Sequence, residues 1–437
     1  MAWPLALLLI LGSVLFMMTT GLPLAFCFIL VNLMGAFLFW GGGIGVEQLV
    51  INMAGSLALF ALLPVPLFVL MGEVLFQTGT APLIIDAIDK WLGRIPGRLS
   101  LVAVGAGTVI GFLSGASMAS VAMLGSTLVP EMEKRGYKNP MSLGPVLAAG
   151  ALDVMIPPSG LAVLMCAIGV ISVGKILIAI IMPGLLMAAF YAVYIVIRAR
   201  LQPSLAPPYE TPPIPLSQKL ISTARYILPT TFVIFMVIGV MMLGIVTPTE
   251  AAGTGALASF ILVAFYGKLS WETAKKSFVA TFKVTVMLFM IICGASTFAQ
   301  NLAYTGATRG FIELAVGLPV PPILVVIIMQ IIILILGTFM DTVGIMMITL
   351  PIYVPVLQAL HFDLVWFGAI MLLNLEMAIV TPPYGTALFT LKAVVPQAPM
   401  KDIYLAGFPF LGMNAIVMAL MLAFPAISLW LPSLMMR

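Results

Sequence analysis

Long apolar stretches with very few charged residues recur along the whole sequence. Of its 437 residues, 62% are hydrophobic and only 8% are charged, whereas soluble domains average roughly 45–50% apolar and about 25% charged residues. Several stretches exceed the roughly 20 apolar residues that a helix needs to cross a bilayer, and the alternating pattern of a membrane β-barrel is absent. Only helices and closed barrels satisfy their backbone hydrogen bonds in lipid, so the sequence predicts an all-α polytopic membrane protein.

The few polar landmarks argue against other kinds of chemistry. No basic residue precedes Lys90, so the N-terminal apolar stretch lacks the basic region of a cleaved signal peptide. Cys27, Cys166 and Cys293 lie in apolar segments without metal-ligand spacing, and we interpret them as packing residues. The single histidine, His361, falls in an outer loop, so no catalytic Ser/His/Asp set is expected. We expect no enzyme, no organic cofactor, no metal other than a transported ion and no nucleic-acid partner.

Two Pro-Pro pairs interrupt apolar stretches that are otherwise long enough to span a membrane. One lies in GALDVMIPPSGLAVL at 150–164 and the other in EMAIVTPPYGTALF at 376–389, each followed by a glycine two residues later. Proline removes a backbone donor and clashes with the preceding helical turn. Each pair is therefore expected to break its helix near mid-membrane, where Ser159-Gly160 or Tyr384-Gly385 would start the next half-helix with exposed amides.

The same landmarks recur after an offset of about 225 residues, on either side of a polar, proline-rich stretch at 199–225. The order of the matches indicates an internal duplication whose two copies are joined by a linker. The matching landmarks are Gly21-Leu22-Pro23 with Val246-Thr247-Pro248, Glu47 with Glu272, Pro130 with Pro355, Pro157-Pro158 with Pro382-Pro383, and Gly160 with Gly385.

We predict an inverted repeat of two five-span halves, each with a re-entrant hairpin and a Pro-Pro-broken helix. The third span of the first half is expected at about 55–78. The apolar stretch that follows, 98–132, is too long for one straight span and has small residues in its middle, so it is expected to fold back at Ser114-Gly115-Ala116-Ser117. Its counterpart would turn at 337–342. The predicted units are a first repeat at 1–198 (scaffold about 1–95, transport hairpin and broken helix about 96–198), a cytoplasmic linker at 199–225, and a second repeat at 226–437 (scaffold about 226–318, transport hairpin and broken helix about 319–437).

The placement of basic residues favours opposite insertion of the two halves. Because a hairpin enters and leaves on one side, five spans in the first half reverse the orientation of the second. If the chain starts outside, only Lys175, Arg309 and Arg437 fall on the outer side, and Lys283 and Lys392 lie within spans. The remaining lysines and arginines face the inner side, as the positive-inside rule requires.

Broken helices and hairpins at membrane depth are typical of secondary transporters, because irregular backbone is tolerated there only where it is buried or lines a cavity. Freed carbonyls then coordinate a small cation, and half-helix N-termini face an anionic group. Serine and glycine at such places also let helices pack closely, and this alternative stays open. The candidate cation ligands are Ser114, Ser117 and the carbonyls of 152–157 for a first site, and Gly337, Thr338, Asp341, Thr342, Thr381 and Gly385 for a second.

Burying an ionisable side chain inside a membrane span costs free energy, so each such residue is first interpreted as a candidate functional residue. Asp341, at the second hairpin tip, is expected either to bind a cation or to cap a helix. Asp153 would ligate a cation, pair with a substrate amine, carry a proton or hold a structural hydrogen bond. Glu376, with Asn374 and Asn301, is interpreted chiefly as a hydrogen-bonding link between helices.

In these residues the sequence resembles the large membrane subunit of tripartite ATP-independent periplasmic (TRAP) transporters, the DctM-like family. The resemblance runs over nearly the whole chain. Its motifs are GLPLAF at 21–26, PLFVLMGEVL at 66–75, GFLSGASMASVAMLGS at 111–126, GY and PPSG within 136–160, TPTEAA at 247–252, and MDTVGIMMITLPIYVP followed by NLEMAIVTPPYGTALF.

The resemblance implies sodium-coupled import of a small organic acid, which a periplasmic solute-binding protein delivers and for which a smaller four-helix membrane subunit completes the complex. It implies a bacterial inner-membrane location, with both termini expected in the periplasm, and an elevator in which hairpins and broken helices move against a scaffold. By position it implies a first sodium site at Ser114, Ser117, Leu152, Val154 and Pro157, and a second at Gly337, Thr338, Asp341, Thr381 and Gly385. From this chain's own residues we expect substrate contacts from Asp153, Ser159, Gly160 and Tyr384.

This chain departs from the family pattern in two places. The first hairpin tip reads SGAS where the family usually has SGS, and Asp153 stands where a small residue is common. An added carboxylate repels a dianionic solute unless sodium or a solute ammonium neutralises it, so we hypothesise a zwitterionic or less charged solute. A stand-alone sodium- or proton-coupled carboxylate symporter of the same architecture is the alternative, whereas a channel would need a continuous polar lining.

Overall fold

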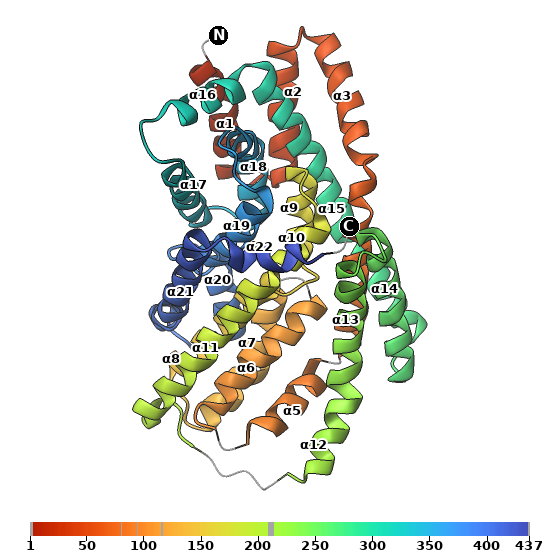
Figure 1. The fold of residues 1–437 in the computed structure, drawn as a ribbon, viewed down its shortest axis with the longest axis vertical. Helices are drawn as coiled ribbons and strands as arrows, with labels where there is room; N and C mark the ends of the chain where they lie inside the picture. Colours follow the sequence, from red (N-terminus) through yellow and green to blue (C-terminus); the bar gives the residue numbers. More distant parts are fainter. Residues whose placement is uncertain (1–2, 80, 94, 115–116, 209–213, 436–437) are drawn as a thin grey trace.

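The computed structural model describes a chain of helices joined by short turns, without a strand in the described part. The fold is elongated, with α1 (Trp3–Thr19), α2 (Leu24–Phe39) and α3 (Gly43–Leu57) at one end and α5 (Ala81–Leu92) toward the other, as Figure 1 shows. The all-α fold predicted from the sequence is confirmed. The described residues are 3–79, 81–93, 95–114, 117–208 and 214–435.

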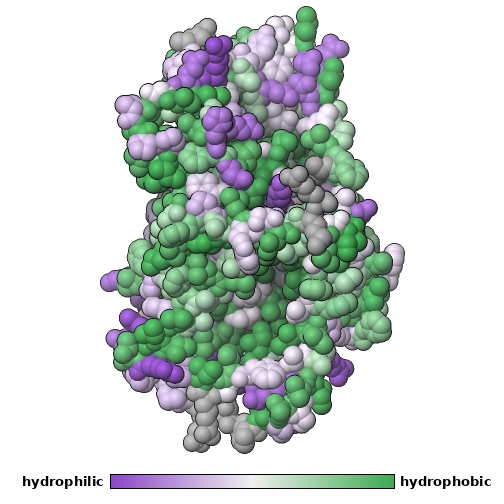
Figure 2. Space-filling model, in the orientation of Figure 1, coloured by the Kyte–Doolittle hydropathy of each residue, from purple (hydrophilic) through white to green (hydrophobic). Residues whose placement is uncertain are grey.

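Several of these helices have the length and apolar character of membrane spans. Within the described ranges, six are long and apolar enough to cross a membrane, or up to eight if each of two bent helix pairs counts as one span. Further apolar helices, such as α1 and α2, are shorter. Figure 2 shows hydrophobic side chains over most of the visible face, with hydrophilic ones mainly toward its two ends. These features agree with the predicted polytopic membrane protein.

The first half contains a hairpin followed by a broken helix. The expected third span at 55–78 is shorter than predicted, because Pro64 and Pro66 occupy the first turn of its helix, where proline is tolerated, and the chain before them forms a separate helix. The remaining helices of this half are α4 (Pro64–Gln77), the hairpin α6 (Arg98–Ser114) and α7 (Ser117–Lys134), the broken helix α8 (Asn139–Met155) and α9 (Gly160–Gly169), and the span made of α10 (Val173–Ala179) and α11 (Ile181–Leu201).

The second half repeats this order. Its α15 is continuous over 34 residues and has no proline, whereas the corresponding part of the first half is divided into α3 and α4. Its helices are α12 (Leu216–Ser222), α13 (Leu228–Met242), α14 (Pro248–Phe265), α15 (Trp271–Tyr304), α16 (Ala307–Gly317), the hairpin α17 (Pro322–Gly337) and α18 (Thr342–Ala359), the broken helix α19 (Leu364–Ala378) and α20 (Thr386–Val394), α21 (Met400–Ala423) and α22 (Ala426–Ser433).

The helix bounds follow the offset found in the sequence. Moving α7 forward by about 225 residues places it on α18, and both helices have 18 residues. The hairpins and the broken helices therefore occupy matching positions in the two halves. Opposite insertion of the halves stays a prediction.

The connection between the halves is shorter than the predicted linker at 199–225. α11 continues to Leu201, and α12 begins at Leu216 and runs through a π-helical turn at Thr223–Ile227 into α13. The stretch LSQKLISTAR contains no proline and has apolar residues at helical spacing, so nothing prevents it from extending the next span. The prolines are confined to the part before Leu216.

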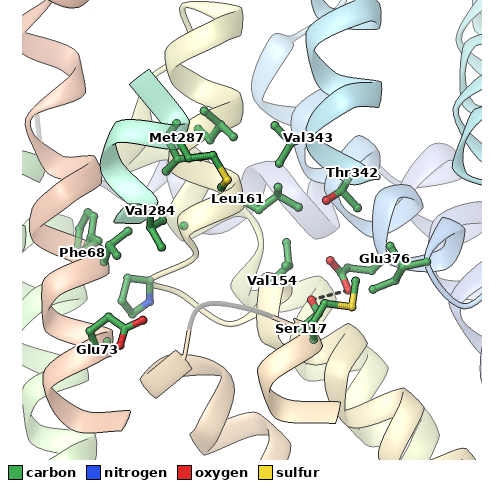
Figure 3. Close-up of a pocket in the computed structure, with 18 residues that line it drawn as sticks. Phe68, Glu73, Ser117, Val154, Leu161, Val284, Met287, Thr342, Val343 and Glu376 are labelled. Carbon is green, nitrogen blue, oxygen red and sulfur yellow. Dashed lines mark hydrogen bonds between the residues drawn. The ribbon is translucent and has the colours of Figure 1, made fainter. Parts of the chain in front are cut away.

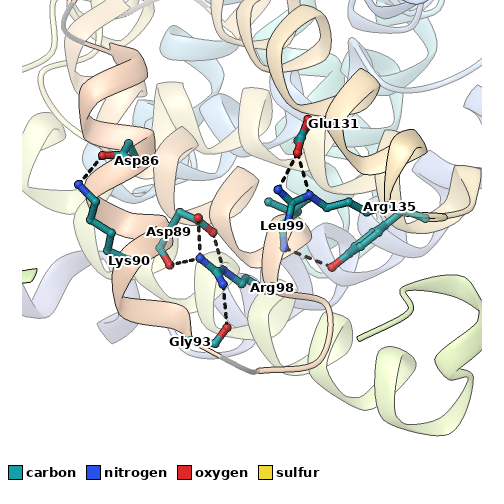
Figure 4. A network of polar contacts seen from close by, with 9 residues as sticks. Asp86, Asp89, Lys90, Gly93, Arg98, Leu99, Glu131 and Arg135 are labelled. Carbon is teal, nitrogen blue, oxygen red and sulfur yellow. Dashed lines mark hydrogen bonds and ion pairs between the residues drawn. The ribbon is translucent and has the colours of Figure 1, made fainter. Parts of the chain in front are cut away.

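Several basic residues predicted for the inner side take part in ion pairs, shown in Figure 4. Lys90 pairs with Asp86 at 2.6 Å and lies on the same helix. Arg98 is only 4% exposed, and its guanidinium donates to both carboxylate oxygens of Asp89 at 2.6 Å and to the Gly93 carbonyl at 3.1 Å. These contacts attach α5 to the start of the first hairpin.

Arg98→Ala is expected to lower the free energy of unfolding by about 2–3 kcal/mol, because it leaves Asp89 and a carbonyl without their charged donor. Lys276→Ala is the matched control: it removes an exposed ion pair with Glu272 on one helix and is expected to cost less than about 1 kcal/mol. Thermal unfolding of both variants in detergent measures the difference. Equal losses would contradict the anchoring role of Arg98.

Candidate functional site

Both Pro-Pro pairs break helices, as predicted. α8 ends at Met155 and α9 starts at Gly160, with a bend of 46° between them. Ser159 caps the new helix, because its Oγ accepts a hydrogen bond from the Ala162 amide at 3.2 Å. The second break separates Ala378, where α19 ends, from Thr386, where α20 begins. Irregular backbone thus occurs at matching places in the two halves.

The hairpin tips lie where the sequence placed them. α6 ends at Ser114 and α7 begins at Ser117, and residues 115–116 lie outside the described part of the chain, as does the side chain of Ser114. At the second tip, Asp341 caps α18 by accepting from the amides of Val343 at 3.2 Å and Gly344 at 3.3 Å. The capping role expected for Asp341 is therefore present, and cation binding by its carboxylate stays a prediction.

A cavity of about 370 Å³ lies between elements of both halves, as Figure 3 shows. One side is formed by α4 and α15, and the other by α7, α9, α18 and α19, together with Val154 near the end of α8. Most of the lining is apolar, and the polar side chains are a serine, a threonine and two glutamates. The lining residues are Phe68, Val69, Gly72, Glu73, Ser117, Met118, Val154, Pro158, Gly160, Leu161, Leu164, Val284, Met287, Leu288, Thr342, Val343, Glu376 and Ile379.

A hydrogen bond at this cavity joins the two halves. Ser117, the first residue of α7, donates its hydroxyl to Glu376 Oε2 on α19 at 2.9 Å. Both side chains are buried, Glu376 with 1% of its surface exposed. The predicted link between helices is therefore observed for Glu376. Asn374 and Asn301 link other pairs of helices: Asn374 on α19 donates to Gln330 Oε1 on α17, and Asn301 on α15 donates to Asn32 Oδ1 on α2.

Asp153 faces the first arm of the hairpin. It is fully buried on α8, and a Cβ added at Gly111 on α6 would lie 2.5 Å from its Oδ1. At the offset of about 225 residues the corresponding pair is Ala378 and Gly337, where an added Cβ would lie 2.1 Å from the Ala378 Cβ. Asp153 therefore fills a place that holds a methyl group in the other half. It is not among the described residues that line the cavity.

The structure brings part of each predicted set together. Of the first cation set and the substrate set, the cavity collects Ser117, Val154 and Gly160. Leu152 is buried within α8, Pro157 lies in the break, Ser159 is occupied as a cap, and Tyr384 is 59% exposed next to Phe389. In the second set the Gly385 amide donates to the Thr381 carbonyl at 3.1 Å, and Gly337 packs against Ala378, close to the same break.

Among the polar side chains of the lining, Glu73 is the one that reasoning from the sequence missed. It lies on α4 and accepts a hydrogen bond from Gln77 at 3.2 Å. The available signal was its charge: Glu73 is a carboxylate within the apolar stretch PLFVLMGEVL, and such residues usually face a bundle interior or a cavity.

Comparison with known proteins gives a family match over almost the whole chain. Residues 11–427 match the family described as the DctM component of the tripartite ATP-independent periplasmic transporter. The chain is 32% identical over 389 residues to a C4-dicarboxylate TRAP transporter large permease protein DctM of Pseudomonas aeruginosa, covering 89% of this chain and 90% of that protein. It is 27% identical over 423 residues to the ectoine TRAP transporter large permease protein TeaC of Halomonas elongata, covering 95% and 96%.

A solved structure has the same fold despite low sequence identity. The crystal structure of the YdaH transporter of Alcanivorax borkumensis matches with a TM-score of 0.66 at 13% identity, over 90% of each chain. At this identity the likeness concerns the fold alone.

Gly337→Ala is expected to destabilise the second hairpin by about 2 kcal/mol or more, because the new methyl group would overlap the Ala378 Cβ and no side-chain rotation relieves that contact. Gly412→Ala in α21 is the matched control, since no atom lies within 4 Å of its Cβ position, and it is expected to be neutral or slightly stabilising. Melting temperatures in detergent measure both changes. A Gly337→Ala protein as stable as the wild type would contradict the close packing of α17 on α19.

Proposed function

Because this chain belongs to the DctM component family of tripartite ATP-independent periplasmic transporters, we propose that it is the large permease subunit of a sodium-coupled importer of a small organic acid. The structural observation that carries the proposal is the cavity that residues of both broken helices help to line, where Ser117 of one half donates to Glu376 of the other. Broken helices around a site shared by two repeats are typical of secondary transporters.

The solute class is proposed from family membership. One relative is named for C4-dicarboxylates and another for ectoine, so the family accepts more than one small solute. A cavity of about 370 Å³ with a mostly apolar lining is at the small end of the roughly 300–1,000 Å³ typical of ligand pockets. This size suits a compact metabolite.

Sodium is proposed as the coupling ion, held near the two breaks. Sodium prefers hard oxygen ligands, which serine and threonine hydroxyls and freed carbonyls provide. The Thr338 hydroxyl donates to the Ile335 carbonyl at 2.7 Å, and the Thr381 hydroxyl donates to the Met377 carbonyl at 2.8 Å. A hydroxyl that donates in this way keeps its lone pairs for a cation. The proposed ligands remain Ser114, Ser117, Leu152, Val154 and Pro157 for the first ion, and Gly337, Thr338, Asp341, Thr381 and Gly385 for the second.

An elevator is proposed for the movement across the membrane. The predicted scaffold supplies one side of the cavity through α4 and α15, and the predicted transport parts supply the other through α7, α9, α18 and α19. A solute bound between them would be carried along α4 and α15 if the hairpins and broken helices moved as one body. Sliding of packed helices and closure around a ligand are established forms of domain motion.

The family also supplies the expected partners and location. TRAP transporters combine the large permease with a small membrane subunit and a periplasmic binding protein, and we propose both for this chain, the small subunit with four helices. The proposed location is the bacterial inner membrane, with both termini in the periplasm. The alternative is a stand-alone symporter of the same architecture, which would need neither partner.

Uptake into proteoliposomes tests the tripartite assignment. We expect a labelled solute to accumulate only when this chain, the small membrane subunit and the binding protein are all present and sodium is higher outside. Leaving out each partner in turn is the control, and uptake is expected to fall to the level of protein-free vesicles. Equal uptake by this chain alone would favour the stand-alone symporter instead.

Ser117→Ala and Thr338→Ala are expected to reduce sodium-dependent uptake at least about tenfold, because each removes a proposed hydroxyl ligand, and loss of about 1.4 kcal/mol of ion binding corresponds to a factor of ten. Thr254→Ala in α14 is the matched control: this hydroxyl also bonds to a carbonyl of its own helix but lies in the predicted scaffold. Sodium titration of uptake measures all three. Equal uptake without sodium under a proton gradient would contradict sodium coupling and direct attention to Asp153 and Asp341.

A further inference from the structure

The charge of the cavity restricts the solute that it accepts. Among the 18 described lining residues, Glu73 and Glu376 are ionisable and none is a lysine, arginine or histidine. A solute with two negative charges would therefore meet two carboxyl groups and no basic side chain. Burying a charge without an opposite partner is strongly unfavourable, so the lining favours a positively charged group inside the cavity.

Glu376 has an oxygen available for such a group. Its side chain is 1% exposed and lines the cavity. Within the described part of the chain, Ser117 is its hydrogen-bond donor, through Oε2. In Figure 3 the carboxyl group of Glu376 lies at the edge of the cavity beside Ser117. Among the described residues no hydrogen bond is made to its Oε1, so this oxygen is available to accept from a group inside the cavity.

Neither carboxyl group has a counterpart in the other half. At the offset of about 225 residues, the position of Glu376 corresponds to Ala151 and that of Glu73 to Phe298, both buried apolar residues. The same helical positions are therefore filled by apolar side chains in the other half. This contrast favours a role in binding over a role in packing.

The start of α9 offers a place in the cavity for a negatively charged group of the solute. Gly160 and Leu161, the first two residues of the ten-residue helix α9, belong to the lining, and the N-terminus of a helix attracts negative charge through its free amides and its dipole. Apolar side chains such as Phe68, Met287 and Val343 form the rest of the wall.

We infer that the imported solute is a zwitterion with an apolar body, whose positively charged nitrogen binds Glu376 and whose carboxylate faces the start of α9. This inference rests on the proposed function, because it assumes that the cavity holds the transported solute. Glu73, on the facing wall, adds negative potential around the nitrogen. A solute with this charge pattern is an amino acid or a betaine in chemical class, and a dicarboxylate is disfavoured.

Uptake from a mixture of metabolites tests the inference, because the solute need not be known in advance. Proteoliposomes that contain the chain with both partners are incubated in a yeast metabolite extract, with and without a sodium gradient, and the trapped solutes are identified by mass spectrometry. We expect the solute that accumulates with sodium to carry both an ammonium group and a carboxylate. Accumulation of a dicarboxylate alone would overturn the inference and leave the proposed function intact. Accumulation of nothing would count against the proposed function itself.

Glu376→Gln tests the assigned residue. Glutamine keeps an oxygen to accept from Ser117 but removes the negative charge, so the variant is expected to fold and to accumulate the zwitterion at least about tenfold less. Glu272→Gln, at an exposed position of α15, is the matched control and should match the wild type. Elution of the purified variants from a sizing column reports folding. Accumulation at the wild-type level by Glu376→Gln would overturn the role of Glu376. The Glu73→Gln variant, measured separately in the same assay, is expected to accumulate less solute if the facing wall contributes to binding.

Discussion

The absence of water in a lipid bilayer is the constraint on which the rest of this structure depends. Pro157-Pro158 and Pro382-Pro383 interrupt helices in apolar surroundings, so the freed backbone groups must find partners inside the protein. Some do so locally: Ser159 accepts from an amide of α9, and the Gly385 amide donates to a carbonyl of its own break. The cavity lies at these breaks, since Val154, Pro158 and Gly160 of the first and Glu376 and Ile379 of the second belong to its lining.

Close contacts at small residues hold each hairpin against its broken helix. Gly111 admits Asp153, and Gly337 admits Ala378, at distances that would not accommodate a Cβ on either glycine. In membranes the hydrophobic effect between helices is weak, and association depends on such close packing. Each hairpin therefore has the contacts of a unit packed together with its broken helix, as the proposed elevator requires of a moving body.

Hydropathy and proline positions predicted the helical fold, both breaks and both hairpin tips, because these depend on local sequence. The same reasoning missed the division of α3 from α4, and it extended the predicted linker into α12. Both errors concern the exact residue at which a helix starts or ends, which the overall hydropathy does not determine. Reasoning from the sequence did not predict the cavity. Ser117 and Glu376 are separated by 259 positions, and no local pattern indicates that their side chains meet or that Glu73 faces them.

The residues that distinguish the two halves carry more functional information than those they share. Shared features, such as the Pro-Pro pairs and the glycine contacts, give the hairpin and the broken helix of each half matching positions. These shared features alone give the cavity no preference for one end of a solute. Glu376, which corresponds to Ala151, and Glu73, which corresponds to Phe298, place carboxyl groups in the cavity lining where the other half has apolar side chains. At each of these two pairs of corresponding positions, one half has a carboxyl group where the other has an apolar side chain.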